Sequence, residues 1–113
     1  MLKIVDGNIY LTRGDSAILE LTIKDENGEE WTPGAGDKVI FALKKAAINP
    51  KRILTIEAVA GDTDIIIDPE DTKDLTIGQY IYDIHVELAG GDIYTVIADK
   101  IFEIGKEAHT EWS

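Results

Sequence analysis

The chain has 113 residues, no cysteine, and a net charge of −11 from 22 acidic and 11 basic residues. This length fits one domain, and the absence of thiols excludes disulfides and thiolate metal sites. The acidity argues against binding to nucleic acid or to anionic membrane surfaces. No apolar run approaches the roughly 20 residues that span a bilayer. The N-terminus shows no signal-peptide pattern, so we expect no export by that route.

Alternation of apolar and polar residues with a period of two dominates the chain and predicts strands. Asn27-Gly28 follows the first clear run and is typical of a tight hairpin, as is Gly90-Gly91 further on. The predicted strands are residues 17–24, 38–44, 53–60, 64–68, 79–89, 93–98 and 100–104. The last of them is either a separate short strand or a bent continuation of the strand before it.

One helical turn is predicted between the strands. Asp68 is placed as its N-cap, Pro69 as its first residue and Asp71 at the third position. We expect this turn to end near Leu75. A long alternating strand follows, and Tyr80 lies at its start. A tyrosine there either bonds back to the upstream backbone, as in immunoglobulin-like domains, or is an ordinary core aromatic.

Short strands at regular spacing, without alternating helices, predict two packed sheets. We therefore expect an all-β, immunoglobulin-like two-sheet antiparallel sandwich with one short helical turn. A single domain would cover residues 1–105, and residues 106–113 would form a tail. The core residues predicted from their shared phase are Leu19, Leu21, Ile23, Val39, Phe41, Leu43, Tyr82, Ile84 and Val86.

Several motifs along the chain resemble a known family. They are Arg13-Gly14-Asp15-Ser16, residues 36–45, residues 68–72, Leu75-x-x-Gly78-x-Tyr80-x-Tyr82, residues 95–97 and residues 102–104. Together they resemble small immunoglobulin-like phage and prophage proteins of Gram-positive bacteria, including the N-terminal module of phage upper baseplate proteins. The resemblance implies a structural role in baseplate, tail or head. It also implies partners that are other virion proteins or further copies, located in the virion or, before assembly, in the bacterial cytoplasm.

The candidate chemical motifs each have a structural alternative that we favour. Arg13-Gly14-Asp15 matches an integrin-binding tripeptide, but a turn with Gly14 at positive φ explains it as well. His85, on the polar face of a strand, and His109, in the tail, share no zinc-site spacing. We therefore expect His85 to be an exposed strand residue.

Two charged clusters remain. The acidic one lacks the ligand order of a calcium loop, so we expect solvated carboxylates and no tight metal site. Its members are Asp62, Asp64, Asp68, Glu70, Asp71 and Asp74. The basic one surrounds the turn at Asn49-Pro50 and either meets an acidic neighbour or is a solvated loop. Its members are Lys44, Lys45, Lys51 and Arg52.

No nucleophile, base and acid are grouped in the sequence, so we expect no enzymatic activity and no cofactor. The interface candidates are Tyr94, Val96 and Trp112. Residues 92–98 are apolar on both faces, so we expect Tyr94 and Val96 to lie on the face away from the core, where they need a cover. The C-terminal segment with Trp112 could supply this cover within the chain, but we favour a second copy or another virion protein. The alternative is an accessory domain that binds carbohydrate or calcium, but Trp31 and Tyr94 are too few aromatic residues to form a platform for a sugar.

Overall fold

Six strands form the largest sheet of the computed structural model, which describes residues 2–5, 8–25, 27–46 and 51–106. In spatial order the strands are β1 (Leu2–Val5), β2 (Asn8–Thr12), β10 (Ile93–Gly105), β9 (Gly78–Glu87), β6 (Lys38–Lys44) and β7 (Arg52–Glu57). The pairings are antiparallel except for β2 with β10, which is parallel.

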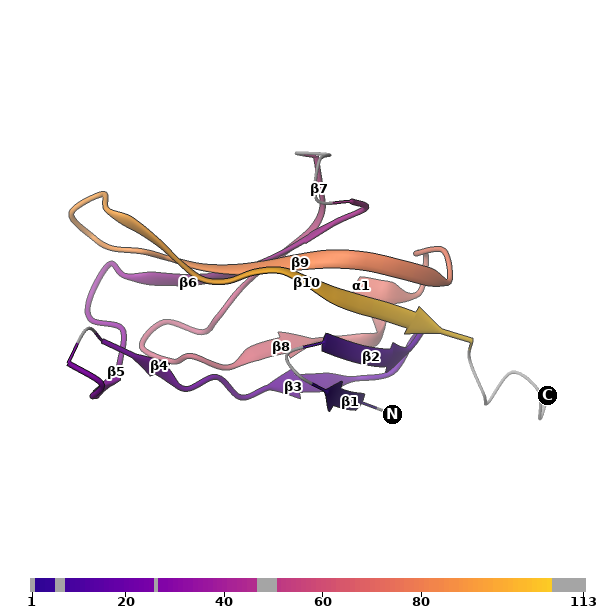
Figure 1. Cartoon of the computed structure of the whole chain (residues 1–113), viewed down its shortest axis with the longest axis horizontal. Helices are drawn as coiled ribbons and strands as arrows, with labels where there is room; N and C mark the ends of the chain where they lie inside the picture. Colours follow the sequence, from indigo (N-terminus) through magenta and orange to yellow (C-terminus); the bar gives the residue numbers. More distant parts are fainter. Residues whose placement is uncertain (1, 6–7, 26, 47–50, 107–113) are drawn as a thin grey trace.

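Two smaller sheets form a second layer. Strand β3 (Ala17–Leu19) pairs with β8 (Ile65–Ile67), and β4 (Ile23–Lys24) pairs with β5 (Glu30–Trp31). Figure 1 shows β3, β4 and β8 lying along one face of β6, β9 and β10. The predicted all-β class is confirmed. No sheet closes on itself within the described ranges, so a barrel is not formed there.

The core lies between these layers and contains three aromatic rings. Phe41 stacks on Tyr82 with 5.5 Å between ring centroids, and Phe102 meets Phe41 edge-on at 5.8 Å. Eight of the nine predicted core residues are buried. The ninth, Leu21, is half-buried because the predicted strand 17–24 is two strands, and Leu21 lies in the irregular segment between them.

The two N-terminal strands were not predicted. Strand β2 carries the period-two signal, since Ile9 and Leu11 are buried and the residues between and beside them are not. Its parallel pairing sets Ile9 opposite Phe102 and Leu11 opposite Ile104. This pairing joins segments more than 90 residues apart in the sequence. A pattern within either segment therefore cannot predict it.

The predicted helical turn is confirmed as α1 (Pro69–Thr72). The carboxylate of Asp71 accepts a hydrogen bond of 2.8 Å from the backbone N–H of Asp68, which is one half of a capping box. The helix ends at Thr72, earlier than the predicted Leu75, whose N–H bonds to the Thr72 carbonyl. Thr72 is fully buried, and its hydroxyl oxygen accepts the N–H of Gly14 at 3.0 Å.

Residues 100–104 are the bent continuation of the strand before them, which was one of the two predicted alternatives, and together the two segments form β10. Its pairing with β9 shifts register between Thr95 and Ile97 and again between Ile97 and Lys100. Asp99, at the second shift, has φ of +53°, a left-handed conformation that suits the short polar side chain of aspartate. Of the predicted tail, residues 107–113 lie outside the described residues, so the boundary after residue 105 stays a prediction.

Candidate functional site

An open groove lies at the end of the molecule where two hairpins face each other. It is lined by residues 22–25 and Trp31 from the β4–β5 hairpin, and by Val86, Leu88 and residues 94–96 from the β9–β10 hairpin. Its volume is about 710 Å³. We call it the hairpin groove.

Both hairpins form for local reasons that the sequence predicted. Gly28 takes φ of +79°, and the Asp25 carboxylate accepts the backbone N–H groups of Asn27 and Glu29. At the other hairpin, the N–H of Gly91 bonds to the carbonyl of Leu88 at 2.8 Å. The turns fix the two walls of the groove and leave the space between them open.

The groove brings together two aromatic residues that are far apart in the sequence. Trp31 lies opposite Ile23 in the β4–β5 pair and packs, partly buried, against the core. Tyr94 lies opposite Val86 in the β9–β10 pair and is 58% exposed. Val96 lines the groove beside Tyr94. Trp31 was considered in the sequence analysis, but its place in the same groove as Tyr94 depends on tertiary packing.

The predicted orientation of Tyr94 and Val96 is wrong. Residues directly opposite each other in an antiparallel pair share a face, and Val86 is buried in the core. Tyr94 therefore lies on the core face, at the end that the second layer leaves uncovered. The register shift after Thr95 adds a residue, which leaves Val96 in the groove as well. Trp112, the third interface candidate, lies outside the described residues.

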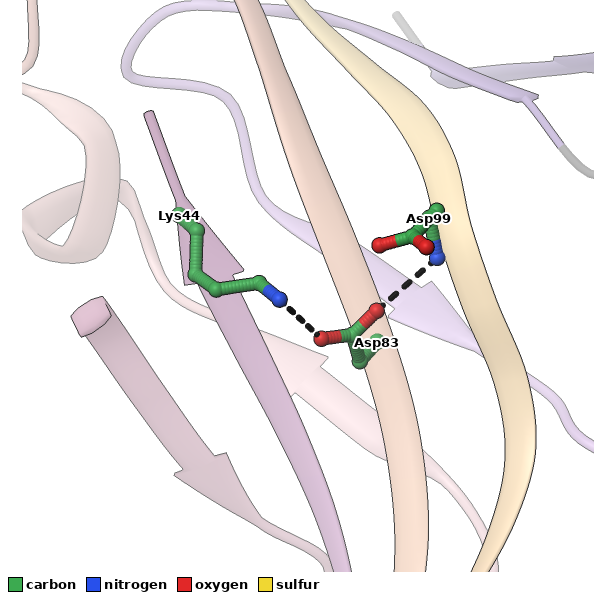
Figure 2. A network of polar contacts seen from close by, with 3 residues as sticks. All are labelled: Lys44, Asp83 and Asp99. Atoms are coloured by element: carbon green, nitrogen blue, oxygen red, sulfur yellow. Dashed lines mark hydrogen bonds and ion pairs between the residues drawn. The ribbon is translucent and has the colours of Figure 1, made fainter. Parts of the chain in front are cut away.

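The basic cluster is largely engaged within the chain. Lys44 Nζ lies 2.7 Å from Asp83 Oδ2, and Asp83 Oδ1 accepts the N–H of Asp99 at 2.9 Å (Figure 2). The ammonium group of Lys45 lies 4.7 Å from the centre of the Tyr80 ring, a cation–π contact. These contacts favour a structural role for the cluster. The Asn49-Pro50 turn lies outside the described residues.

Asp83 is the carboxylate on which this network converges. Partial burial raises its pKa, but the hydrogen bonds from Lys44 and Asp99 and the charges of Lys44 and Arg52 outweigh that effect, so the pKa of Asp83 is lowered. The network holds β6, β9 and the bend of β10 together (Figure 2).

The tripeptide Arg13-Gly14-Asp15 forms the predicted turn. Gly14 has φ of +82°, and the N–H of Asp15 bonds to the carbonyl of Thr12. The guanidinium group of Arg13 donates to the carbonyl of Leu75 at 3.3 Å. The tripeptide therefore ties the N-terminal strands to the segment after α1.

His85 is buried, and the prediction of an exposed histidine is wrong. It lies on the face of the large sheet away from the core, opposite Ile40 of β6 and Thr95 of β10, and is 9% exposed. A residue on a central strand is covered by its neighbours on both sides even when it points out of the core. His109 lies outside the described residues.

The acidic residues form no metal-ligand group among the described residues. Across residues 2–5, 8–25, 27–46 and 51–106, no three His, Asp or Glu side chains are grouped as metal ligands would be. Asp62 accepts the N–H of Thr63, and Glu70 lies 3.5 Å from Lys73. In the same ranges no helix is long and apolar enough to span a membrane.

Comparison of the chain with protein-family models, with curated proteins and with solved structures gives no match. Function is therefore inferred from the residues of the chain and from their arrangement in the fold.

Proposed function

We propose that the chain is a non-catalytic, immunoglobulin-like module of a phage or prophage virion, in the baseplate, tail or head. It binds a neighbouring virion protein, either a different protein or another copy, through the hairpin groove. The observation that carries this proposal is the groove itself, which is lined by Trp31 from one hairpin and by Tyr94 and Val96, both exposed, from the other. Exposed aromatic side chains beside a hollow are typical anchors of protein interfaces.

The strand order supports the immunoglobulin-like part of the proposal. The order β10-β9-β6-β7 in the large sheet corresponds to strands G, F, C and C′ of a variable-type domain, and the pair β3-β8 corresponds to strands B and E. The hydroxyl of Tyr80 bonds to the carbonyl of Thr76 at 2.6 Å, as the tyrosine corner of such domains requires.

The virion part of the proposal rests on the family resemblance of the sequence. The structure gives a physical role to one of the motifs that carry the resemblance, residues 36–45. Asp37 accepts the N–H groups of Gly34 and Ala89, each at 2.9 Å, and so ties the start of β6 to the end of β9. The motif around Gly36-Asp37 therefore stabilises the end of the molecule at which the hairpin groove opens.

The groove fits a protein partner by its chemistry. Its lining combines aromatic and aliphatic side chains with one cation, Lys24, and one anion, Asp25. Because these two charges offset each other, binding in the groove would depend mainly on the shape of the partner and on the apolar surface that it buries. An apolar side chain of the partner, inserted between Trp31 and Tyr94, would remove both from water.

Photo-crosslinking in phage-producing cells tests the proposal. A benzoylphenylalanine placed at position 94 should form an adduct with a virion protein, identified by mass spectrometry of purified particles. The same group at position 53, an exposed residue of β7 away from the groove, is the control. The proposal fails if position 94 gives no adduct, or if both positions give the same products.

A carbohydrate-binding domain is the alternative, and the observation that favours it is that Trp31 and Tyr94 both line one groove. Sugar stacking on Trp31 would change tryptophan fluorescence, and the variant Trp112→Phe, in which Trp31 is the one remaining tryptophan, assigns the change to this residue. Titration with soluble glycans from the host cell wall therefore separates the two functions, because a saturating fluorescence change abolished by Tyr94→Ala would support the sugar. The calcium form of this alternative would instead require calcium binding that Asp64→Ala abolishes in calorimetry.

A further inference from the structure

A second hollow lies between the outermost strands of two sheets. It is lined by residues 55–57 and 59 from β7 and the segment after it, and by Asp64, Ile66, Asp68 and Asp71 from β8 and α1 with their flanks. Its volume is about 400 Å³, and no residue lines both this hollow and the hairpin groove. We call it the edge cleft.

The strands on either side of the edge cleft each have one edge without a neighbour. In the described part of the chain, β7 is the last strand of the large sheet and β8 pairs with β3 alone. The backbone N–H and carbonyl groups of such an edge are available to an added strand. An extended peptide that enters the cleft can therefore pair with β7 or β8.

Apolar side chains are exposed in and beside the edge cleft. Val59 is 61% exposed, and Ile66 is 43% exposed. Ile18 lies directly opposite Ile66 in the β3–β8 pair and is 54% exposed, so it extends the apolar surface across the small sheet. An apolar surface with a polar rim next to an open strand edge is typical of a binding site for another chain.

The charges of the residues that line the edge cleft indicate which kind of partner chain would bind there. The ionisable residues that line the cleft are the carboxylates of Glu57, Asp64, Asp68 and Asp71. Within the described ranges no basic side chain forms an ion pair with them. A second copy, with its own net charge of −11, would place like charges against this rim. A partner segment with lysine or arginine would instead complement it.

We propose that the edge cleft binds an extended segment of another protein in which lysine or arginine alternates with apolar residues. The backbone of the segment pairs with the free edge of β7 or β8, its apolar side chains cover Val59 and Ile66, and its cations face the rim carboxylates. This site is separate from the hairpin groove, so either one can fail in experiment without the other.

The probe is a blocked, fluorescently labelled hexapeptide, Lys-Val-Lys-Ile-Lys-Val, titrated into the full chain and followed by anisotropy. We expect saturable binding that weakens with salt. The double variant Glu57→Gln/Asp64→Asn should weaken it by about tenfold, as loss of two ion pairs predicts. The control Glu29→Gln/Asp92→Asn removes the same charge elsewhere and should leave the affinity within about twofold. Two further peptides replace the lysines by glutamate or the apolar residues by serine, and neither should bind.

Hydrogen exchange locates the bound peptide. Backbone N–H groups of residues 52–57 or 65–67 should exchange more slowly in the complex. Ile66→Lys, at an exposed position that tolerates a charge, should abolish binding while the thermal melt stays unchanged. The proposal is overturned if the lysine peptide does not bind at millimolar concentration, or if both double variants lose affinity equally. Protection confined to the hairpin groove overturns it as well.

Discussion

The hydroxyl of Tyr80 donates a hydrogen bond of 2.6 Å to the backbone carbonyl of Thr76, four residues earlier in the chain. The ring of Tyr80 is buried, and Lys45 lies over it. This contact fixes the corner through which the chain passes from α1 into β9. The sequence allowed a corner tyrosine or an ordinary core residue at this position, and the hydrogen bond favours the corner.

Tyr80→Phe should therefore destabilise the fold by about 1 kcal/mol, because it removes one hydrogen bond and keeps the ring packing. Urea denaturation measures this loss. Tyr94→Phe, which removes the hydroxyl of an exposed tyrosine, is the matched control and should leave the free energy of unfolding unchanged. Equal effects of the two variants would show that the Tyr80 hydroxyl bond does not stabilise the corner.

Phe41→Ala should cost about 3–5 kcal/mol, since the phenyl ring is fully buried and its removal leaves a cavity beside Tyr82 and Phe102. The exposed position Ile53 on the neighbouring strand provides the control Ile53→Ala. A loss below 1 kcal/mol in denaturant melts would mean that the three-ring cluster does not hold the two layers together.

Gly36→Ala should destabilise the fold by about 1–3 kcal/mol for two reasons. Gly36 has φ of +84°, and an added Cβ would lie 2.9 Å from the Cβ of Ala89. Gly90→Ala is the control, because an added Cβ there meets no atom within 4 Å. Thermal unfolding of both variants measures the difference, and equal melting temperatures would contradict the packing of Gly36 against Ala89.

How much the sequence predicts depends on whether a feature is local. The strands of the core, both hairpins and the capped turn at Pro69 follow from period-two alternation and turn chemistry, which neighbouring residues set. Strand β2 has the same alternation in Asn8–Thr12 and could have been found by it. Its parallel partner could not, because that pairing joins the two ends of the chain.

For a related reason, the sequence identified two residues of the hairpin groove but not the face of the sheet on which they lie. Tyr94 and Val96 were identified from the apolar residues on both faces of their strand. The face they occupy depends on the register against β9 and on the bulge after Thr95, and alternation within one strand fixes neither. The burial of His85 likewise depends on Ile40 and Thr95, which belong to neighbouring strands.

The Lys44–Asp83 network makes the free energy of unfolding depend on pH. The pKa of Asp83 is lower in the folded chain, so the native state favours the carboxylate. Its contribution is fully present above the unfolded pKa of about 3.9 and is lost as pH falls through the folded pKa. Asp83→Asn should therefore cost about 1 kcal/mol at neutral pH and flatten the loss of stability below pH 4.

Urea melts of the wild type and of Asp83→Asn between pH 7 and pH 2 measure this effect. Asp74→Asn, which changes a carboxylate in an exposed turn, serves as the control. If Asp83→Asn and the wild type lose stability in parallel below pH 4, the network does not couple protonation to folding.

Tyr94→Lys places a charge in the hairpin groove at a residue that is already 58% exposed. We expect the isolated domain to keep its stability within about 0.5 kcal/mol, as surface substitutions do. If the proposed function holds, its association should weaken, because the proposed anchor Tyr94 is replaced by an ion that must be desolvated. Ile77→Lys changes an exposed isoleucine that does not line the groove and controls for the added charge. Light scattering and retention by purified virion proteins are the measurements. If Tyr94→Lys, Ile77→Lys and the wild type share one mass and one retention, then the hairpin groove is not the surface through which the chain associates.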